Sequence, residues 1–223
     1  MPQVQPKDPV TEEDWRRAEF TEEFGSVPLL VDAERQIYRF AGGVCRVLRR
    51  EVGPWTMMKS DIADSPDHLG VYYNAPNTAF GVSVPDRAFD PYTTRNMWLI
   101  DLGFGNPYYE NASRRMVRQV LTQPELRANP LPLDWTVSPG YTAYRTPIGD
   151  SLVLVNPDVQ GGVFCEKDLF RWPNPNCEGL ILFDEKESAT FTLHATLLPK
   201  LDEVIRSIRD LQASIRINCP VTP

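Results

Sequence analysis

The chain has 223 residues, of which 42% are hydrophobic and 24% charged, the usual balance for a globular protein. Its formal net charge of −7 argues against a nucleic-acid-binding protein of the usual basic kind, and no apolar run approaches the ~20 residues of a membrane-spanning helix. The 21 prolines exclude long regular elements, because proline removes a hydrogen bond from a helix interior and a donor from a central strand.

The first part of the chain predicts one helix followed by short strands. Thr11 is a suitable N-cap for a helix with acidic residues in its first turn, and Gly25 is a suitable end. Strands are predicted over residues 27–31 and 36–40. The spacing of apolar residues over 44–52 fits either a strand or a short helix.

The middle of the chain predicts a strand pair, a buried strand and a second helix. Residues 69–73 and 79–84 are two short runs with strand character, joined by a turn rich in Asn and Pro. The mostly apolar run at 97–102 is typical of a buried strand. Asn106 and Pro107 then suit the cap and the first position of a helix.

A proline-rich connector over residues 129–139 follows, and it is the candidate boundary if the chain has two lobes. The remaining chain predicts five strands, at residues 141–145, 152–155, 162–165, 180–183 and 190–198. In the last of these, apolar residues alternate with threonines and His194, which predicts one buried face and one open face. Pro199 opens a final helix with an apolar stripe.

Together these elements predict an α+β fold, in which a few short helices pack on a largely antiparallel sheet and many loops are rich in proline. We expect a single domain over residues 11–218. An N-terminal arm at 1–10 and a C-terminal arm at 219–223 flank it.

The sequence has four cysteines and no C-x-x-C pair: Cys45, Cys165, Cys177 and Cys219. No secretory signal is visible, so we expect reduced, mostly buried thiols and a location in the cytoplasm or in a particle assembled there. Cys165 and Cys177 flank a proline-rich loop and could meet if that loop closes.

Residues 97–107 read Met-Trp-Leu-Ile-Asp-Leu-Gly-Phe-Gly-Asn-Pro. The pattern resembles the first motif of Rossmann-type S-adenosylmethionine-dependent methyltransferases, whose glycines let the backbone approach a ligand at a helix N-terminus. The resemblance implies that Asp101, Gly103 and Gly105 would line a cofactor pocket. Pro107 stands where that motif has its third glycine, so the alternative interpretation is a strand, a glycine turn and a helix cap that bind no cofactor.

Residues 149–152 spell Gly-Asp-Ser-Leu, the signature of the GDSL esterases. In that family the apolar strand precedes the motif, whereas here the apolar run follows it. We therefore interpret Ser151 as part of a hairpin turn between the strands at 141–145 and 152–155. Because His68 and His194 complete neither a triad nor a metal site, no catalytic or metal-ligating residue is predicted.

The remaining signals favour contact with other proteins. The basic residues are 18 Arg and 5 Lys, and arginine is enriched at protein interfaces. The interface candidates are Trp15 in the first helix and two arginine clusters, Arg46, Arg49 and Arg50, and Arg114, Arg115 and Arg118.

We therefore expect a non-enzymatic structural subunit of a larger protein assembly, such as a tail or connector component of a phage or virus particle. Its partners would be other protein subunits, without nucleic acid, membrane, metal or cofactor. Two alternatives are a methyltransferase-like enzyme that uses S-adenosylmethionine and a small intracellular inhibitor or immunity protein.

Overall fold

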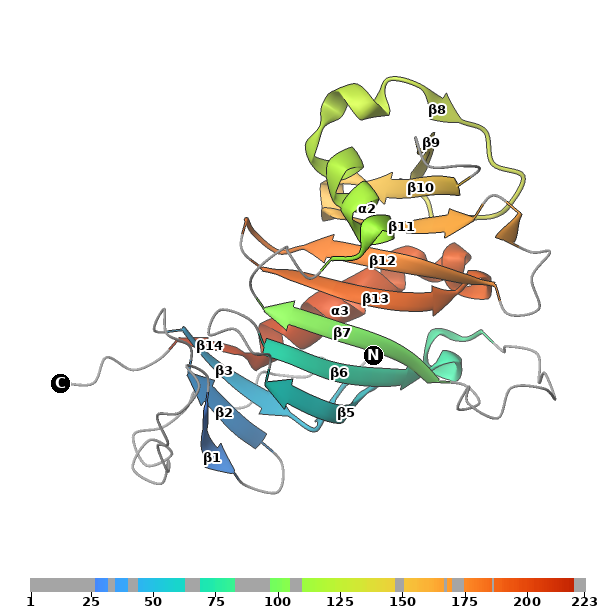
Figure 1. Ribbon diagram of the computed structural model, residues 1–223. Helices are drawn as coiled ribbons and strands as arrows, with labels where there is room; N and C mark the ends of the chain where they lie inside the picture. The colour runs from blue at the N-terminus through green and yellow to red at the C-terminus, as the bar shows by residue number, and fades with distance from the viewer. Residues whose placement is uncertain are drawn as a thin grey trace.

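The computed structural model describes residues 27–31, 35–39, 44–62, 69–82, 97–104, 110–146, 151–166, 168–169, 175–185 and 187–218. These residues form two antiparallel sheets and two α-helices (Figure 1), which confirms the predicted α+β class. The predicted helix that begins at Thr11 and contains Trp15 lies outside the described residues, as do both predicted arms.

The larger sheet has ten strands, and every neighbouring pair is antiparallel. In spatial order they are β4 (Glu51–Val52), β5 (Trp55–Ile62), β6 (Leu69–Pro76), β7 (Met97–Phe104), β13 (Ser188–His194), β12 (Asn176–Leu182), β11 (Gly161–Glu166), β10 (Ser151–Asn156), β9 (Thr142–Arg145) and β8 (Pro130–Leu131). The pairing of β7 with β13 joins the two halves of the chain, with Asp101 opposite Thr190.

The smaller sheet has the order β1 (Val27–Val31), β2 (Arg35–Arg39), β3 (Val44–Arg49) and β14 (Arg216–Asn218). It lies beside the β5–β7 end of the larger sheet (Figure 1). Its fourth strand comes from the other end of the sequence, because β14 follows the last helix directly. The segment at 44–52, for which the sequence left two possibilities open, forms the strands β3 and β4, which are separated by a bend at Arg50.

Two α-helices cover opposite faces of the larger sheet (Figure 1). The first, α2 (Ala112–Thr122), packs Val117, Val120 and Leu121 against β10 and β12. The second, α3 (Leu201–Ile215), buries a longer apolar stripe in the main core. Neither α-helix has the length and apolar character that crossing a membrane requires, and the same holds for the rest of the described chain.

The strands between the two helices are buried on both faces. In β10, Val153 and Val155 pack with α2, whereas the intervening Leu154 belongs to the core on the α3 side. The predicted open face of the strand at 190–198 is wrong, because Thr190 and His194 are buried as well. That strand also ends at His194, and the chain continues as the 3-10 helix η6 (Ala195–Lys200).

Two other predicted elements differ in the structure. The segment at 69–76 is one strand, and it pairs with β5, which the sequence did not reveal. The residues after it form the 3-10 helix η1 (Asn77–Phe80) instead of a second strand. The described helix begins at Ala112, and the side chain of Asn111 caps it by accepting a hydrogen bond from the Arg114 backbone N–H. The helix start predicted at Asn106 and Pro107 lies outside the described residues.

The proline-rich connector at 129–139 is fixed at both ends. At its start, β8 pairs with β9 at the edge of the larger sheet. Near its end, the Ser138 backbone N–H donates to the Leu198 carbonyl at 2.9 Å, and the Ser138 hydroxyl donates to the Pro199 carbonyl at 3.0 Å. The connector thus links the sheet edge to the start of α3. Two further 3-10 helices are η3 (Pro124–Arg127), just before the connector, and η4 (Pro157–Val159), between β10 and β11.

Candidate functional site

The three described cysteines are oxidised, so the reduced thiols predicted for them are wrong. Cys165 and Cys177 form a disulfide between the neighbouring strands β11 and β12, with their Cα atoms 4.6 Å apart. Cys45 is also disulfide-bonded, and no described cysteine is a free thiol. All three of these residues are fully buried, so the disulfides belong to the structural core.

The described part of the methyltransferase-like motif, residues 97–104, is the strand β7. Asp101 and Gly103 belong to β7, where Asp101 pairs with Tyr72 on one side and with Thr190 on the other. Both neighbouring strands are antiparallel to β7, whereas a Rossmann-type site needs a parallel strand followed by a glycine turn and a helix. The described part of the motif therefore gives no support for a cofactor pocket, and Gly105 lies outside the described residues.

Ser151 begins β10, which pairs with β9 as the hairpin interpretation requires. Its backbone carbonyl accepts a hydrogen bond from the Thr146 N–H at 3.3 Å. His194 caps the helix η6, because its Nδ1 accepts from the Thr196 backbone N–H at 3.3 Å. His68 lies outside the described residues, and within them no group of acidic residues, His and Cys could hold a metal ion.

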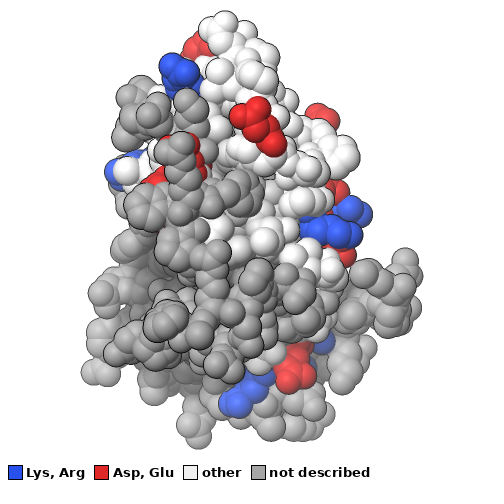
Figure 2. Space-filling model, turned by 90° about the vertical axis from the view of Figure 1, so that its right-hand side faces the viewer, with Lys and Arg blue, Asp and Glu red and all other residues white. Residues whose placement is uncertain are grey.

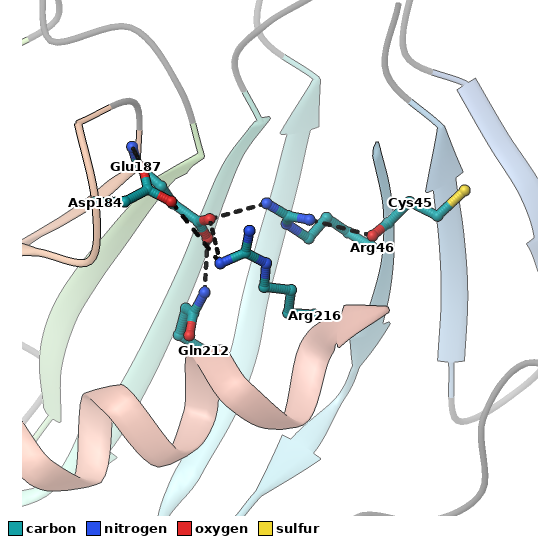
Figure 3. Close-up of polar contacts among 6 residues, drawn as sticks. All are labelled: Cys45, Arg46, Asp184, Glu187, Gln212 and Arg216. Atoms are coloured by element: carbon teal, nitrogen blue, oxygen red, sulfur yellow. Dashed lines mark hydrogen bonds and ion pairs between the residues drawn. The ribbon is translucent and has the colours of Figure 1, made fainter. Parts of the chain in front are cut away.

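The first arginine cluster does not form one surface. Arg46 is only 5% exposed, and its Nη2 lies 3.0 Å from Glu187 Oε2 (Figure 3). Arg49 is partly buried, and its backbone carbonyl accepts from the Tyr73 hydroxyl at 2.9 Å. Of the three predicted interface arginines in this cluster, Arg50 alone is exposed. Arg50 lies in a bend just after β3 ends at Arg49, whereas Arg46 lies inside the strand among buried neighbours, which accounts for the difference in exposure.

The ion pair of Arg46 is the centre of a buried polar junction, which we define as Arg46, Asp184, Glu187, Gln212 and Arg216. Gln212 on α3 donates to Glu187 Oε1 at 2.9 Å, and Arg216 Nη1 on β14 lies 3.5 Å from Glu187 Oε2. Figure 3 shows these side chains converging on one carboxylate from α3 and the small sheet. Burial lowers the pKa of Arg46, and the Glu187 carboxylate opposes that shift. The junction joins both sheets to α3.

The second arginine cluster lies on α2. Arg118 forms an ion pair with the buried carboxylate of Glu110, which its Nε contacts at 2.9 and 3.0 Å. Arg114 is partly buried, and Arg115 is exposed. Arg115 is therefore the residue of this cluster that is most available to a partner.

A surface pocket forms where the connector crosses the β9–β10 hairpin, and we call it the Trp135 pocket. It is lined by residues 131–135, Arg145 at the end of β9, Ser151 and Leu152 at the start of β10, and Asp168. Its volume is about 330 Å³, at the lower end of the range of ligand sites, ~300–1,000 Å³. The pocket is thus large enough for one or two side chains.

The apolar part of the Trp135 pocket is firmly supported. Leu131, Leu133 and Trp135 are partly buried and pack against the main core, and Leu152 is buried. The connector is held by β8 on one side of the pocket and by Ser138 on the other. Asp168 follows shortly after the end of β11, and the disulfide ties Cys165 in that strand to Cys177 in β12. These constraints give the pocket a defined shape.

The charged groups of the pocket are exposed and of both signs. Asp134, Arg145 and Asp168 are all exposed. Within the described part of the chain, neither the Asp134 carboxylate nor the Arg145 guanidinium takes part in an ion pair or a hydrogen bond. Figure 2 shows basic and acidic residues interspersed in small groups over one face of the molecule. The charges visible on this face therefore form no large region of a single sign that would attract an oppositely charged partner from a distance.

Sequence reasoning did not find the Trp135 pocket. Its lining comes from a connector, a hairpin and the loop closed by the disulfide, and each segment is unremarkable in isolation. The one available signal was Trp135 in a proline-rich connector, since a large aromatic residue outside a regular element needs a packing partner. Comparisons with protein-family models, with curated proteins and with solved structures find no match to this chain.

Proposed function

We propose that this protein is a non-enzymatic subunit of a larger protein assembly and that it docks a partner protein at the Trp135 pocket. The observation that carries the proposal is the composition of the pocket: a tryptophan and leucines on a supported floor, with Asp134 and Arg145, which take part in no ion pair or hydrogen bond within the described part of the chain. Tryptophan and arginine are the residues most enriched among those that dominate binding energy at interfaces.

Rigidity supports the same proposal. The connector is anchored at β8 and at Ser138, and the Cys165–Cys177 disulfide restrains the opposite wall. A surface that is already ordered loses less conformational entropy on binding, so more of the contact energy appears as affinity. By contrast, Arg46 and Arg118 use their charges inside the molecule, and the proposal assigns them structural roles.

The disulfides change the expected location. Disulfides form and persist in oxidising surroundings, such as the periplasm, the extracellular space or the surface of a virion. The proposal therefore places the mature chain in such surroundings, in place of the cytoplasm expected from its sequence. A component on the outside of a phage or virus particle is one concrete form of such a subunit. Titrating thiols in the denatured, unreduced protein tests this placement, because an oxidised chain exposes none.

The docking proposal is tested by native mass in the natural source of the protein. A tagged chain should elute in a complex well above its own 25.4 kDa, and Trp135→Ala should release it as a folded monomer, with a melting temperature lowered only by the loss of the contacts that Trp135 makes with the core. Leu126→Ala is the matched control, because Leu126 is the large apolar residue that is 43% exposed elsewhere on the described surface. A wild-type monomer, or a W135A variant that stays in the complex, would contradict the proposal.

A further inference from the structure

We infer that Asn111 carries an N-linked glycan. Residues 111–113 read Asn-Ala-Ser, which is the acceptor triplet for this modification, with no proline in the middle position. No other asparagine of the chain is followed by Ser or Thr two residues later. The inference rests on the oxidising surroundings proposed above and is independent of docking at the Trp135 pocket.

The disulfides give this triplet its weight. With the cysteines expected as reduced thiols, the triplet has no role, because a chain kept in reducing surroundings does not meet the glycosylation machinery. The described cysteines are instead disulfide-bonded. Disulfides form in the lumen of the secretory pathway, and asparagine-linked glycans are added in the same compartment. The oxidised chain and its acceptor triplet therefore point to the same history.

Asn111 lies where a glycan can project into solvent. Its side chain is exposed, and so are those of Ala112 and Arg115 in the first turn of α2. Its backbone is extended, with φ −68° and ψ 175°, so Asn111 stands just outside the helix that it caps. A glycan is bulky and hydrophilic and is accommodated only at the surface. The position meets that requirement.

The hydrogen bonds of Asn111 are compatible with the modification. Its Oδ1 accepts from the Arg114 backbone N–H at 3.0 Å, and its Nδ2 donates to Glu178 Oε2 at 2.7 Å. An amide nitrogen carries two hydrogens, and the bond to Glu178 uses one of them. A transfer that replaces the other hydrogen leaves both the helix cap and the link to β12 in place.

The transfer is a substitution at the anomeric carbon of a sugar. The donor class is an oligosaccharide carried on a lipid diphosphate. A bond forms between Asn111 Nδ2 and the anomeric carbon, and the bond from that carbon to the diphosphate oxygen breaks. The lipid diphosphate leaves with the electron pair, and one amide proton is released. No oxidant or reductant is needed.

A glycan at this position limits where other subunits can bind. It would cover the start of α2, the helix that crosses one face of β10–β12 (Figure 1). Neither Asn111 nor its partner Glu178 lines the Trp135 pocket. The glycan therefore excludes a partner from the first turn of α2 and leaves the pocket open to one.

The test is the intact mass of the tagged chain, purified from its natural source, before and after treatment with a peptide N-glycosidase. The untreated chain should exceed the mass of its sequence by that of an oligosaccharide, and the enzyme should remove the excess. Because the enzyme converts a glycosylated Asn to Asp, digestion in water labelled with heavy oxygen should mark Asn111 and no other asparagine.

Ser113→Ala and Ser113→Thr form a matched pair. Ser113→Ala should abolish the excess mass, whereas Ser113→Thr should retain it, because Thr also completes the triplet. Both variants keep Asn111 and its hydrogen bonds to Arg114 and Glu178. Ala is a better helix former than Ser, so the loss of the glycan in S113A does not follow from a failure to fold. Thermal melting of both variants checks this.

The outcomes separate the glycan from the function proposed above. A chain purified at the mass of its bare sequence, or an excess mass that persists in S113A, overturns the glycan. An oxidised chain without a glycan leaves the proposed surroundings standing, because the thiol titration is a separate measurement. A glycosylated chain that is monomeric in its natural source refutes docking and leaves the glycan established.

Discussion

Replacing Glu187 with Gln tests whether the buried polar junction holds the two sheets and α3 together. The carboxylate is 5% exposed and receives Arg46 at 3.0 Å, Gln212 at 2.9 Å and Arg216 at 3.5 Å. Breaking a buried ion pair by removing one partner costs about 3–5 kcal/mol, because the remaining charge stays buried without compensation. Because the amide of Gln still accepts hydrogen bonds, we expect the loss in the free energy of unfolding to lie at the lower end of this range, at about 3 kcal/mol.

The assay is urea unfolding of the oxidised protein at neutral pH, followed by tryptophan fluorescence and by circular dichroism. A loss of about 3 kcal/mol corresponds to a fall in melting temperature of about 6–12 °C for a chain of this size. Glu203→Gln is the matched control. It removes the same charge from the exposed Lys200–Glu203 pair, and exposed pairs contribute at most about 1 kcal/mol.

A double variant distinguishes the ion pair from simple loss of packing. Arg46→Met should destabilise the wild type by more than it destabilises the E187Q variant, because in that variant the arginine has already lost its principal charge partner. If E187Q is no more destabilising than E203Q, or if the effects of R46M and E187Q are additive, the junction does not hold the fold together and the reasoning is refuted.

Three further predictions concern the core. Gly179→Ala should cost about 1–3 kcal/mol in urea unfolding, because its new Cβ would lie 2.1 Å from the ring of Phe191; wild-type stability would show that the ring moves freely. Replacing both Cys165 and Cys177 with Ala should cost about 3 kcal/mol, the chain-entropy value for a sequence separation of 12; an unchanged stability would show that the bond does not form. Burial raises the pKa of Tyr141, and Asp202 adds to the shift. Stability from the neutral phenol is therefore present below its unfolded pKa of about 10 and is lost as pH rises above it. Tyr141→Phe should become progressively more stable than wild type above about pH 10 in thermal melts, and a constant difference across that range would contradict the assignment.

The predictable part of this protein consists of local elements. The strands at 141–145, 152–155 and 162–165 were recognised because each is a short apolar run bounded by turn residues. The stripe of α3 was visible for the same reason, since the spacing of its apolar residues follows the helical period. The antiparallel arrangement also followed, because these strands succeed one another with connections too short for crossovers.

Contacts between distant segments were not predictable from such patterns. Arg46 and Glu187 are 141 positions apart, and nothing near either residue indicates its partner. The sequence also left open which apolar strands are covered on both faces, since a run such as residues 152–155 shows burial but does not identify the helix on each side. The sequence indicated that Cys165 and Cys177 could meet but left open whether their loop closes. The Trp135 pocket likewise depends on how strands and loops meet in space. Local preference determines the elements of this protein, whereas the burial of charge and the shape of its surface arise only when those elements pack.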